Sequence, residues 1–126
     1  MVDIPAQVAH WRQGAEEDWA AASLLIDRAH IRQGLFFAHL SIEEALKALV
    51  CRRTQDVPPR THNLVRLAEF AQLELTPGRL DVLADLNRFS MVGRYPDIGD
   101  RPGLPADVTG YLARAREVLQ WLMTQS

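Results

Sequence analysis

The chain has 126 residues, 48% of them hydrophobic and 24% charged, which are ordinary proportions for a single globular domain. Its 14 basic and 16 acidic side chains leave a net charge of −2, which excludes a strongly basic protein whose overall field would attract nucleic acid or an anionic membrane. The lone cysteine, Cys51, cannot form an internal disulfide, and neither a signal peptide nor a run of roughly 18 apolar residues occurs, so we expect a cytoplasmic protein without a membrane segment.

The first two predicted elements are long amphipathic helices, over about residues 6–29 and 32–53. In each of them, apolar residues recur at alternating steps of three and four, which places those residues on one face of an α-helix. Asp3 before Pro5 is a start signal for the first helix, because Asp caps helices well and proline is tolerated in the first turn. The apolar stripe of the second helix consists of Leu35, Ala38, Ile42, Ala45 and Leu49.

A second line of residues on this second helix carries charge. His39, Glu43 and Lys47 lie four residues apart, and Phe36 and Leu40 flank them. Glu43 and Lys47 form a helix-stabilising pair worth about 0.3 kcal/mol. This face either lines a cleft or forms a partly solvated seam between helices or subunits, in which the charges pair with each other. Because Phe36 and Leu40 need covering, we favour the seam, with a second copy of the chain against it.

The remaining elements are shorter helices and loops. The stretch "TQDVPPRTHN", residues 54–63, interrupts the helical pattern, and its two consecutive prolines predict an extended connection. Thr61 is the expected cap of a third helix, Thr76 and Pro77 begin a fourth that Gly93 ends, and a last helix starts at about residue 106. No alternating strand pattern occurs. The sequence therefore predicts an all-α, antiparallel bundle of four to five helices, forming one domain over residues 1–126.

Several kinds of functional site are missing from the sequence. The four histidines are scattered and a single cysteine cannot build a zinc site, so no metal is expected. No glycine-rich phosphate loop, nucleophile elbow, HExxH pattern or DNA-binding motif occurs, so no cofactor is expected either. An enzyme built from this chain would have to use Arg, His, Glu, Tyr or Lys without a metal of its own.

The loop "GRYPD", residues 93–97, is the first candidate for ligand binding. Arg94 in a proline-rigidified turn presents five hydrogen-bond donors that suit a phosphate or a carboxylate, and Tyr95 beside it is able to stack on a base. In the structural alternative, Arg94 forms a salt bridge with Asp97 or binds a helix end, and Tyr95 fills the rim of the bundle.

The stretch "PPRTHN" provides a second candidate, because it places His62 in the first turn of the predicted third helix. A neutral imidazole at that position is able to serve as a base or to bind a hydroxyl group. The alternative is that His62 only caps the helix or braces the loop. The complete set of ligand-binding candidates is Arg94, Tyr95, Asp97, His62 and Lys47. The candidates for an interface or a cleft are Phe36, His39, Leu40 and Glu43, and no residue is assigned a catalytic role.

Three segments in series, "GLFFAHLSIEEALKAL", "PPRTHNLVRLAEF" and "GRYPD", resemble the HEPN domain family (higher eukaryotes and prokaryotes nucleotide-binding). The similarity covers nearly the whole chain, in the same order. It implies a bundle of four or five helices that is usually a homodimer. Members of the family are often encoded beside a minimal nucleotidyltransferase, and the two proteins act as toxin and antitoxin.

The resemblance also implies a reaction, from which this sequence departs. Many HEPN proteins are metal-independent ribonucleases with an Arg and a His four to six residues apart, late in the domain. There the His would exchange protons at the 2′-OH and the Arg would stabilise the phosphate. In this chain no histidine follows His62, and Arg32 and His39, which have that spacing, lie in the second helix. The chain looks more like the branch with a PP-x-TH element and an RYP element, for which nucleotide or RNA binding is inferred.

These observations lead to one main hypothesis and several alternatives. The main hypothesis is a HEPN-type nucleotide- or RNA-binding module, toxin-like, that forms a homodimer and acts with a minimal nucleotidyltransferase. One alternative is a metal-independent ribonuclease with an unusual arrangement of Arg and His. Another is a scaffold that binds only other proteins. Tyr95 or Tyr111 is, in addition, a candidate to receive a nucleotide from the partner.

Overall fold

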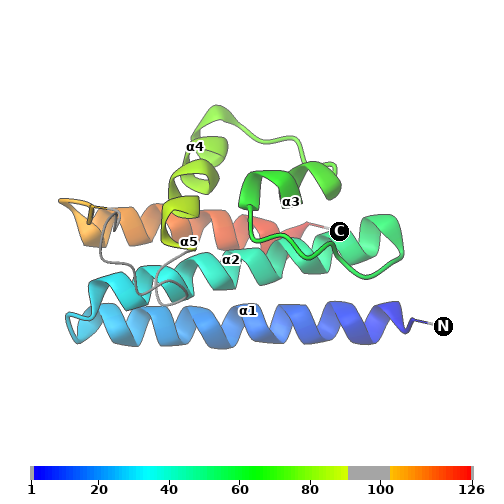
Figure 1. Cartoon of the computed structure of the whole chain (residues 1–126), viewed down its shortest axis with the longest axis horizontal. Coiled ribbons are helices and arrows are strands. Elements are labelled where there is room, and N and C mark those ends of the chain that lie inside the picture. The colour runs from blue at the N-terminus through cyan, green and yellow to red at the C-terminus, as the bar shows by residue number, and fades with distance from the viewer. Residues whose placement is uncertain (1, 91–102, 126) are drawn as a thin grey trace.

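The computed structural model describes residues 2–90 and 103–125, and Figure 1 shows that these form helices joined by short connections. Its elements are α1 (Ile4–Asp27), α2 (Ile31–Thr54), α3 (Leu64–Phe70), α4 (Pro77–Leu86), the 3-10 helix η1 (Asn87–Phe89) and α5 (Val108–Thr124). No strand occurs in the described part of the chain. The predicted all-α fold with four to five helices is therefore confirmed.

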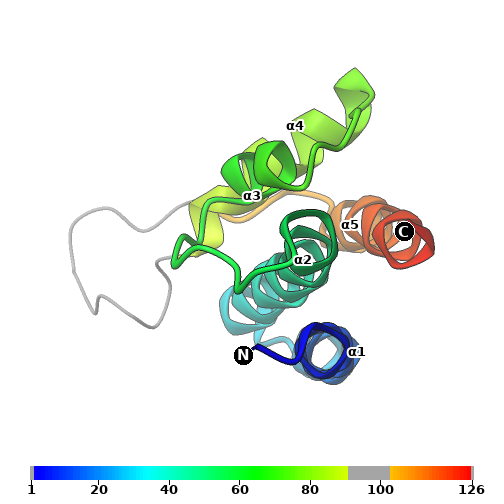
Figure 2. The ribbon, with the colours of Figure 1, turned by 90° about the vertical axis from the view of Figure 1, so that its right-hand side faces the viewer.

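The helices are arranged around α2. α1 and α2 form a long antiparallel hairpin, and α5 lies along α2 in the same direction as α2 (Figure 1). α3, α4 and η1 form a second layer that covers another side of α2, as the end-on view in Figure 2 shows. α2 thus contacts α1, α3, η1 and α5, which agrees with its unusually wide apolar surface in the sequence.

Side-chain caps explain where most helices begin. Asp3 Oδ1 accepts a hydrogen bond from Ala6 N (3.1 Å), and Thr76 Oγ1 accepts one from Arg79 N (3.2 Å), so both predicted start signals are confirmed. α5 begins at Val108, close to the predicted residue 106, because Asp107 caps it. In each case the side-chain oxygen satisfies an amide of the first turn that has no partner within the helix.

Two predicted boundaries are wrong. Asn63, and not Thr61, caps α3, because the Asn63 Oδ1 atom accepts hydrogen bonds from two amides of the first turn. The prediction missed this because both residue types are good caps and the choice depends on where the connection turns into the helix. α4 ends at Leu86 and η1 continues only to Phe89, earlier than the predicted end at Gly93, which lies outside the described residues.

Close packing between α1 and α2 fixes how their side chains meet. At Gly34 the two helices approach so closely that an added Cβ atom would overlap the Ile26 side chain. Two turns further along α2, Ser41 Oγ donates a hydrogen bond of 2.6 Å to the carbonyl of Ala15. These two contacts set the rotation of α2, so that Leu35, Ile42, Leu46 and Leu49 enter the main core while the His39–Glu43–Lys47 line lies on another side.

The structure also shows the environment of Cys51 and the apolar character of the helices. Cys51 is a free thiol, fully buried, and it packs as an apolar side chain, while burial raises its pKa. Within residues 2–90 and 103–125, none of the helices has a stretch that is both long enough and apolar enough to cross a membrane.

Candidate functional site

The line of His39, Glu43 and Lys47 lies inside the protein and not on its surface. In the isolated chain these residues are 0%, 2% and 7% exposed, respectively. This corrects the expectation that the line is partly solvated, whereas the expected pairing of its charges with each other is seen. Phe36 and Leu40, which flank the line, are only partly buried, so they still present apolar surface on this side of α2.

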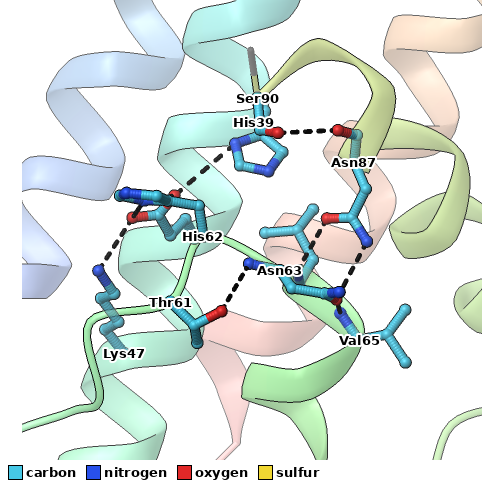
Figure 3. A network of polar contacts seen from close by, with 10 residues as sticks. His39, Lys47, Thr61, His62, Asn63, Val65, Asn87 and Ser90 are labelled. Atoms are coloured by element: carbon cyan, nitrogen blue, oxygen red, sulfur yellow. Dashed lines mark hydrogen bonds and ion pairs between the residues drawn. The ribbon is translucent and has the colours of Figure 1, made fainter. Parts of the chain in front are cut away.

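The carboxylate of Glu43 is the centre of the site. Lys47 Nζ donates a hydrogen bond of 3.0 Å to Glu43 Oε2, and His62 Nδ1 lies 3.1 Å from both oxygens. His39 Nδ1 lies 3.8 Å from Oε1. Figure 3 shows the three basic side chains converging on this one group. Three nitrogen-bearing groups thus surround one carboxylate, which offsets the cost of burying its charge.

His62 reaches this carboxylate from the connection between α2 and α3. Because Asn63 is the cap, His62 precedes the helix, so the prediction that it lies in the first turn is wrong. Its side chain remains 52% exposed although its Nδ1 atom faces the buried Glu43. In the described part of the chain the ring makes its hydrogen bonds through Nδ1, which leaves Nε2 available for another partner.

A pair of asparagines holds the connection in place. Asn63 Oδ1 accepts a hydrogen bond of 3.1 Å from Asn87 Nδ2, and Asn87 Oδ1 accepts one of 2.9 Å from the amide of Leu64. Figure 3 shows this pair next to His62. We call the two residues the asparagine clasp. Since the clasp joins the start of α3 to the start of η1, it fixes the backbone that carries His62.

Trp11 supplies the wall on the α1 side. The Lys47 ammonium group lies 5.2 Å from the centre of the Trp11 ring, which is a cation–π distance. Lys47 is therefore held between an aromatic face and a carboxylate. Sequence analysis missed Trp11 as a site residue, because its place in the apolar stripe of the first helix indicated only a core position.

The arrangement is suited to two kinds of chemistry. A buried carboxylate on Nδ1 holds the imidazole in one orientation and one tautomer, which leaves Nε2 able to accept a proton. A protonated imidazole beside Lys47 would instead bind an anion such as a phosphate. Within residues 2–90 and 103–125, no cluster of three His, Cys, Asp or Glu residues is placed to hold a metal ion.

The sequence candidates fall into two groups. His62 and Lys47, predicted separately from different segments, are brought together by Glu43, and His39 joins them. Arg94, Tyr95 and Asp97 lie outside the described residues. The asparagine clasp was not predicted, although an asparagine directly before the apolar start of "NLVRL" is a recognisable helix-capping signal.

A separate polar group lies between α4, η1 and α5. It lines a hollow of about 710 Å³. The Tyr111 hydroxyl donates a hydrogen bond to Asp85, and Arg88 binds the same carboxylate at 3.1 Å. Partial burial works to raise the pKa of Asp85, but the hydrogen bonds from Tyr111 and Arg88 outweigh it and leave the pKa lowered. Burial and the bond to Asp85 raise the pKa of Tyr111, so its hydroxyl is a poor nucleophile.

Comparisons with known proteins give one matching family profile and one solved structure with a similar fold. The profile named HEPN domain matches residues 8–125. Among solved structures, the crystal structure of an archaeal HEPN homologue superposes with a TM-score of 0.68 at 21% sequence identity, covering 92% of this chain and 94% of the other. Among curated proteins, no significant sequence match was found.

Proposed function

This chain belongs to the HEPN domain family, and on that premise we propose that it binds a nucleotide or RNA at Glu43, Lys47 and His62. At the family level the chain is a nucleotide- or RNA-related module. In the finer proposal it is a toxin-like component that acts with a minimal nucleotidyltransferase. The observation that carries the ligand proposal is a half-exposed imidazole that a buried carboxylate holds in place.

The charges around Glu43 support an anionic ligand. One carboxylate is faced by an ammonium group and two imidazoles, so protonation of either imidazole leaves a net positive site. His62 is the member of this set whose side chain is accessible, at 52% exposed. A phosphate oxygen that accepts a hydrogen bond from Nε2 would therefore meet positive charge without displacing any contact inside the protein.

Titration with ATP and with a short single-stranded RNA tests the ligand proposal. We expect His62→Ala to weaken binding by about tenfold or more, which is the loss of one charge-assisted hydrogen bond. His30→Ala is the matched control, because His30 is exposed at the turn between α1 and α2 and makes no capping bond. Arg94→Ala tests the loop predicted from sequence. Absence of binding to both ligands would contradict the proposal and favour a scaffold that binds only proteins.

The proposed partner is testable separately. The neighbouring reading frame should encode a minimal nucleotidyltransferase, and the two proteins should copurify when they are expressed together. An unrelated neighbour that does not copurify would contradict the partner proposal. Ligand binding at His62 would be unaffected by that outcome.

A metal-independent ribonuclease is the second candidate, and the Glu43–His62 pair favours it. His62 Nε2 would take the proton of a 2′-OH, whose oxygen attacks the adjacent phosphorus while the 5′-oxygen leaves and is protonated by water. Incubation with RNA in excess EDTA distinguishes the two functions. Cleavage that persists in EDTA and is lost in both His62→Ala and Glu43→Gln would support the ribonuclease. No cleavage, with RNA binding retained, would contradict it.

A further inference from the structure

The hollow between α4, η1 and α5 is closed at one end by a polar contact. Tyr111 of α5 donates a hydrogen bond to the Asp85 carboxylate of α4, and Arg88 of η1 binds both oxygens of that carboxylate, at 3.1 and 3.2 Å. Arg88 Nη1 also donates a hydrogen bond of 3.2 Å to the carbonyl of Gly103. Asp85 and Arg88 therefore neutralise each other, and with Tyr111 they form the end wall of the hollow.

The hollow opens away from this contact, toward the beginning of α4. Figure 1 shows α4 steeply inclined to α5, with the end of α4 next to α5. Gly78, in the first turn of α4, lines the hollow, and an added Cβ atom there would meet nothing within 4 Å. The volume of about 710 Å³ lies within the range of small-molecule sites, so a small organic molecule has room to enter from this side.

Two opposite charges on the walls of the hollow have no partner in the described part of the chain. Asp81 on α4 and Arg114 on α5 both line the hollow and are exposed. Within residues 2–90 and 103–125, neither side chain takes part in a hydrogen bond or an ion pair. The Arg114 guanidinium lies over the Tyr111 ring, 5.9 Å from its centre. This contact orients the guanidinium and leaves its hydrogen-bond donors available to a ligand.

The hollow also offers apolar surface, because Val82 of α4 and the Tyr111 ring line it and are only partly buried. Asp81 lies four residues before Asp85, about 6 Å along α4, and Arg114 lies three residues after Tyr111, about 4.5 Å along α5. The two helices diverge from the contact between Asp85 and Tyr111. A molecule that touches both charges therefore has to reach from one helix to the other across this surface.

We propose that this hollow binds a small zwitterion whose ammonium group and carboxylate are separated by a short apolar chain. The carboxylate binds the Arg114 guanidinium, whose paired donors match its two oxygens, and the ammonium group binds Asp81. The chain lies against Val82 and Tyr111. A ligand with one charge would cover the opposite charge without providing a partner for it, which costs free energy. A zwitterion satisfies both charges, and it matches a hollow whose charged side chains sum to zero, namely Asp81, Asp85, Arg88 and Arg114.

The proposed zwitterion site is separate from the Glu43 site. None of the described residues that line the hollow contacts the carboxylate of Glu43, which is bound by Lys47 and His62. The two sites approach each other only through η1, where Arg88 directly follows Asn87 of the asparagine clasp. The proposal therefore does not depend on which ligand binds at His62.

Probes matched in shape and different in charge test the proposal on the full chain by isothermal titration calorimetry. The zwitterions are the ω-amino acids aminobutanoate, aminohexanoate and aminooctanoate, and the singly charged counterparts are hexanoate and hexylamine. We expect saturable binding of at least one ω-amino acid, and binding of both counterparts about tenfold weaker or more, since each lacks one charged contact. No saturable binding of any of the three ω-amino acids would overturn the proposal. Equally tight binding of hexanoate or of hexylamine would also overturn it, in favour of a site for a single charge.

Variants on the two walls identify the contacts. Arg114→Gln and Asp81→Asn should each weaken binding of the tightest ω-amino acid by about tenfold or more, because each removes a charge-assisted hydrogen bond. Arg116→Gln is the matched control and should bind like the parent, since Arg116 is exposed on α5 and does not line this hollow. Parental affinity in either wall variant, or equal loss in the control, would overturn the assignment. Circular dichroism verifies that each variant is folded. Titration of the same variants with ATP and RNA should be unchanged, so failure here is distinguishable from failure of the proposed site at His62.

Discussion

Glu43 and Lys47 show how a single chain tolerates charge in its interior. Their side chains are 3% and 9% exposed, and the pair is bound at 3.0 Å. Removing both charges from water costs several kcal/mol, which their mutual attraction and the additional contacts to His62 and Trp11 offset. The stability of the site therefore depends on keeping all of these contacts together.

Removing one charge of the Glu43–Lys47 pair should lower the free energy of unfolding more than removing both charges. We expect Glu43→Gln to lower the free energy of unfolding by about 3 kcal/mol, because Lys47 would stay buried without a counter-charge. Glu43→Gln combined with Lys47→Met should be less destabilised than the sum of the single variants. Urea unfolding of the four proteins in this cycle measures the interaction. Additive losses would show that the pair is not coupled.

Glu44, the next residue on α2, is a partly buried acid whose pKa is shifted. Burial, a hydrogen bond to Asp18, and the charges of Asp18 and Glu43 raise its pKa to about 9, while Lys47 works in the opposite direction. Its Oε2 atom lies where a Cβ atom on residue 14 would stand, so Gly14 is what admits this side chain against α1. Glu44 is therefore protonated at neutral pH and lies between the two long helices.

The raised pKa of Glu44 predicts that the protein becomes less stable in alkali. A carboxyl group whose pKa is higher in the folded state than the usual 4.5 binds its proton more tightly when folded. Its contribution is therefore full below about pH 4.5 and is lost as the pH rises toward about 9. Urea unfolding at several values in this window should show the decrease in the parent and a smaller one in Glu44→Gln. An equal decrease in both proteins would show that the loss of stability comes from another titrating side chain.

At the scale of elements, the α1–α2 hairpin is held by glycine at its closest approach. Gly34→Ala should destabilise the protein by about 1–3 kcal/mol, since the new methyl group would overlap Ile26 and force the helices apart. Gly78→Ala is the matched control, because nothing lies within 4 Å of its added Cβ atom in α4. That variant should be neutral or stabilised by up to about 1 kcal/mol. Thermal unfolding compares the stabilities of the two variants. A loss of stability in both would assign the effect to the helix propensity of the substituted residue and not to packing between α1 and α2.

The cap of α3 links the stability of an element to the geometry of the site. Asn63→Ala should cost about 1–2 kcal/mol, because two amides of α3 and the Asn87 side chain lose their acceptor. It should also weaken ligand binding, although Asn63 itself is not a proposed ligand contact. Thr61→Ala, which removes one hydroxyl that accepts from the Asn63 amide, is the milder comparison. Unchanged binding in Asn63→Ala would show that His62 is positioned without the cap.

Elements that depend on local sequence were predictable, and contacts between distant segments were not. The spacing of apolar residues predicted α1 and α2 to within two residues at their ends, because amphipathicity and capping are local properties. The same spacing placed His39, Glu43 and Lys47 on one face correctly. Glu43 contacts His62, 19 residues later, and Lys47 contacts Trp11 of α1, and no local pattern encodes these contacts. The depth at which these charges are buried was therefore not predictable from the sequence.

At the scale of the whole molecule, the apolar interior consists of two unequal parts. The main core joins side chains from all five α-helices and η1. A small second cluster of Val8, Ala48 and Cys51, with Ile4 and Trp11 against it, holds the first turns of α1 at the open end of the hairpin. Few apolar contacts hold those first turns, so they should open without unfolding the rest.

Hydrogen exchange should reveal this difference. Amides of the first two turns of α1 should exchange faster than those in the middle of α2, where Ile42 and Leu46 are fully buried. Peptide-resolved mass spectrometry in native buffer measures both regions in one experiment. Similar protection in the two regions would mean that the small cluster opens only with the whole molecule.

The asparagine clasp also couples the position of His62 to the position of η1. It joins the backbone beside His62 to Asn87 through two hydrogen bonds, so a displacement of either residue should shift the other. A ligand that binds the His62 imidazole and displaces this connection should therefore also displace η1. Because such coupling is reciprocal, a molecule that binds η1 should change the free energy of ligand binding at His62 by the same amount as the ligand changes the free energy of its own binding.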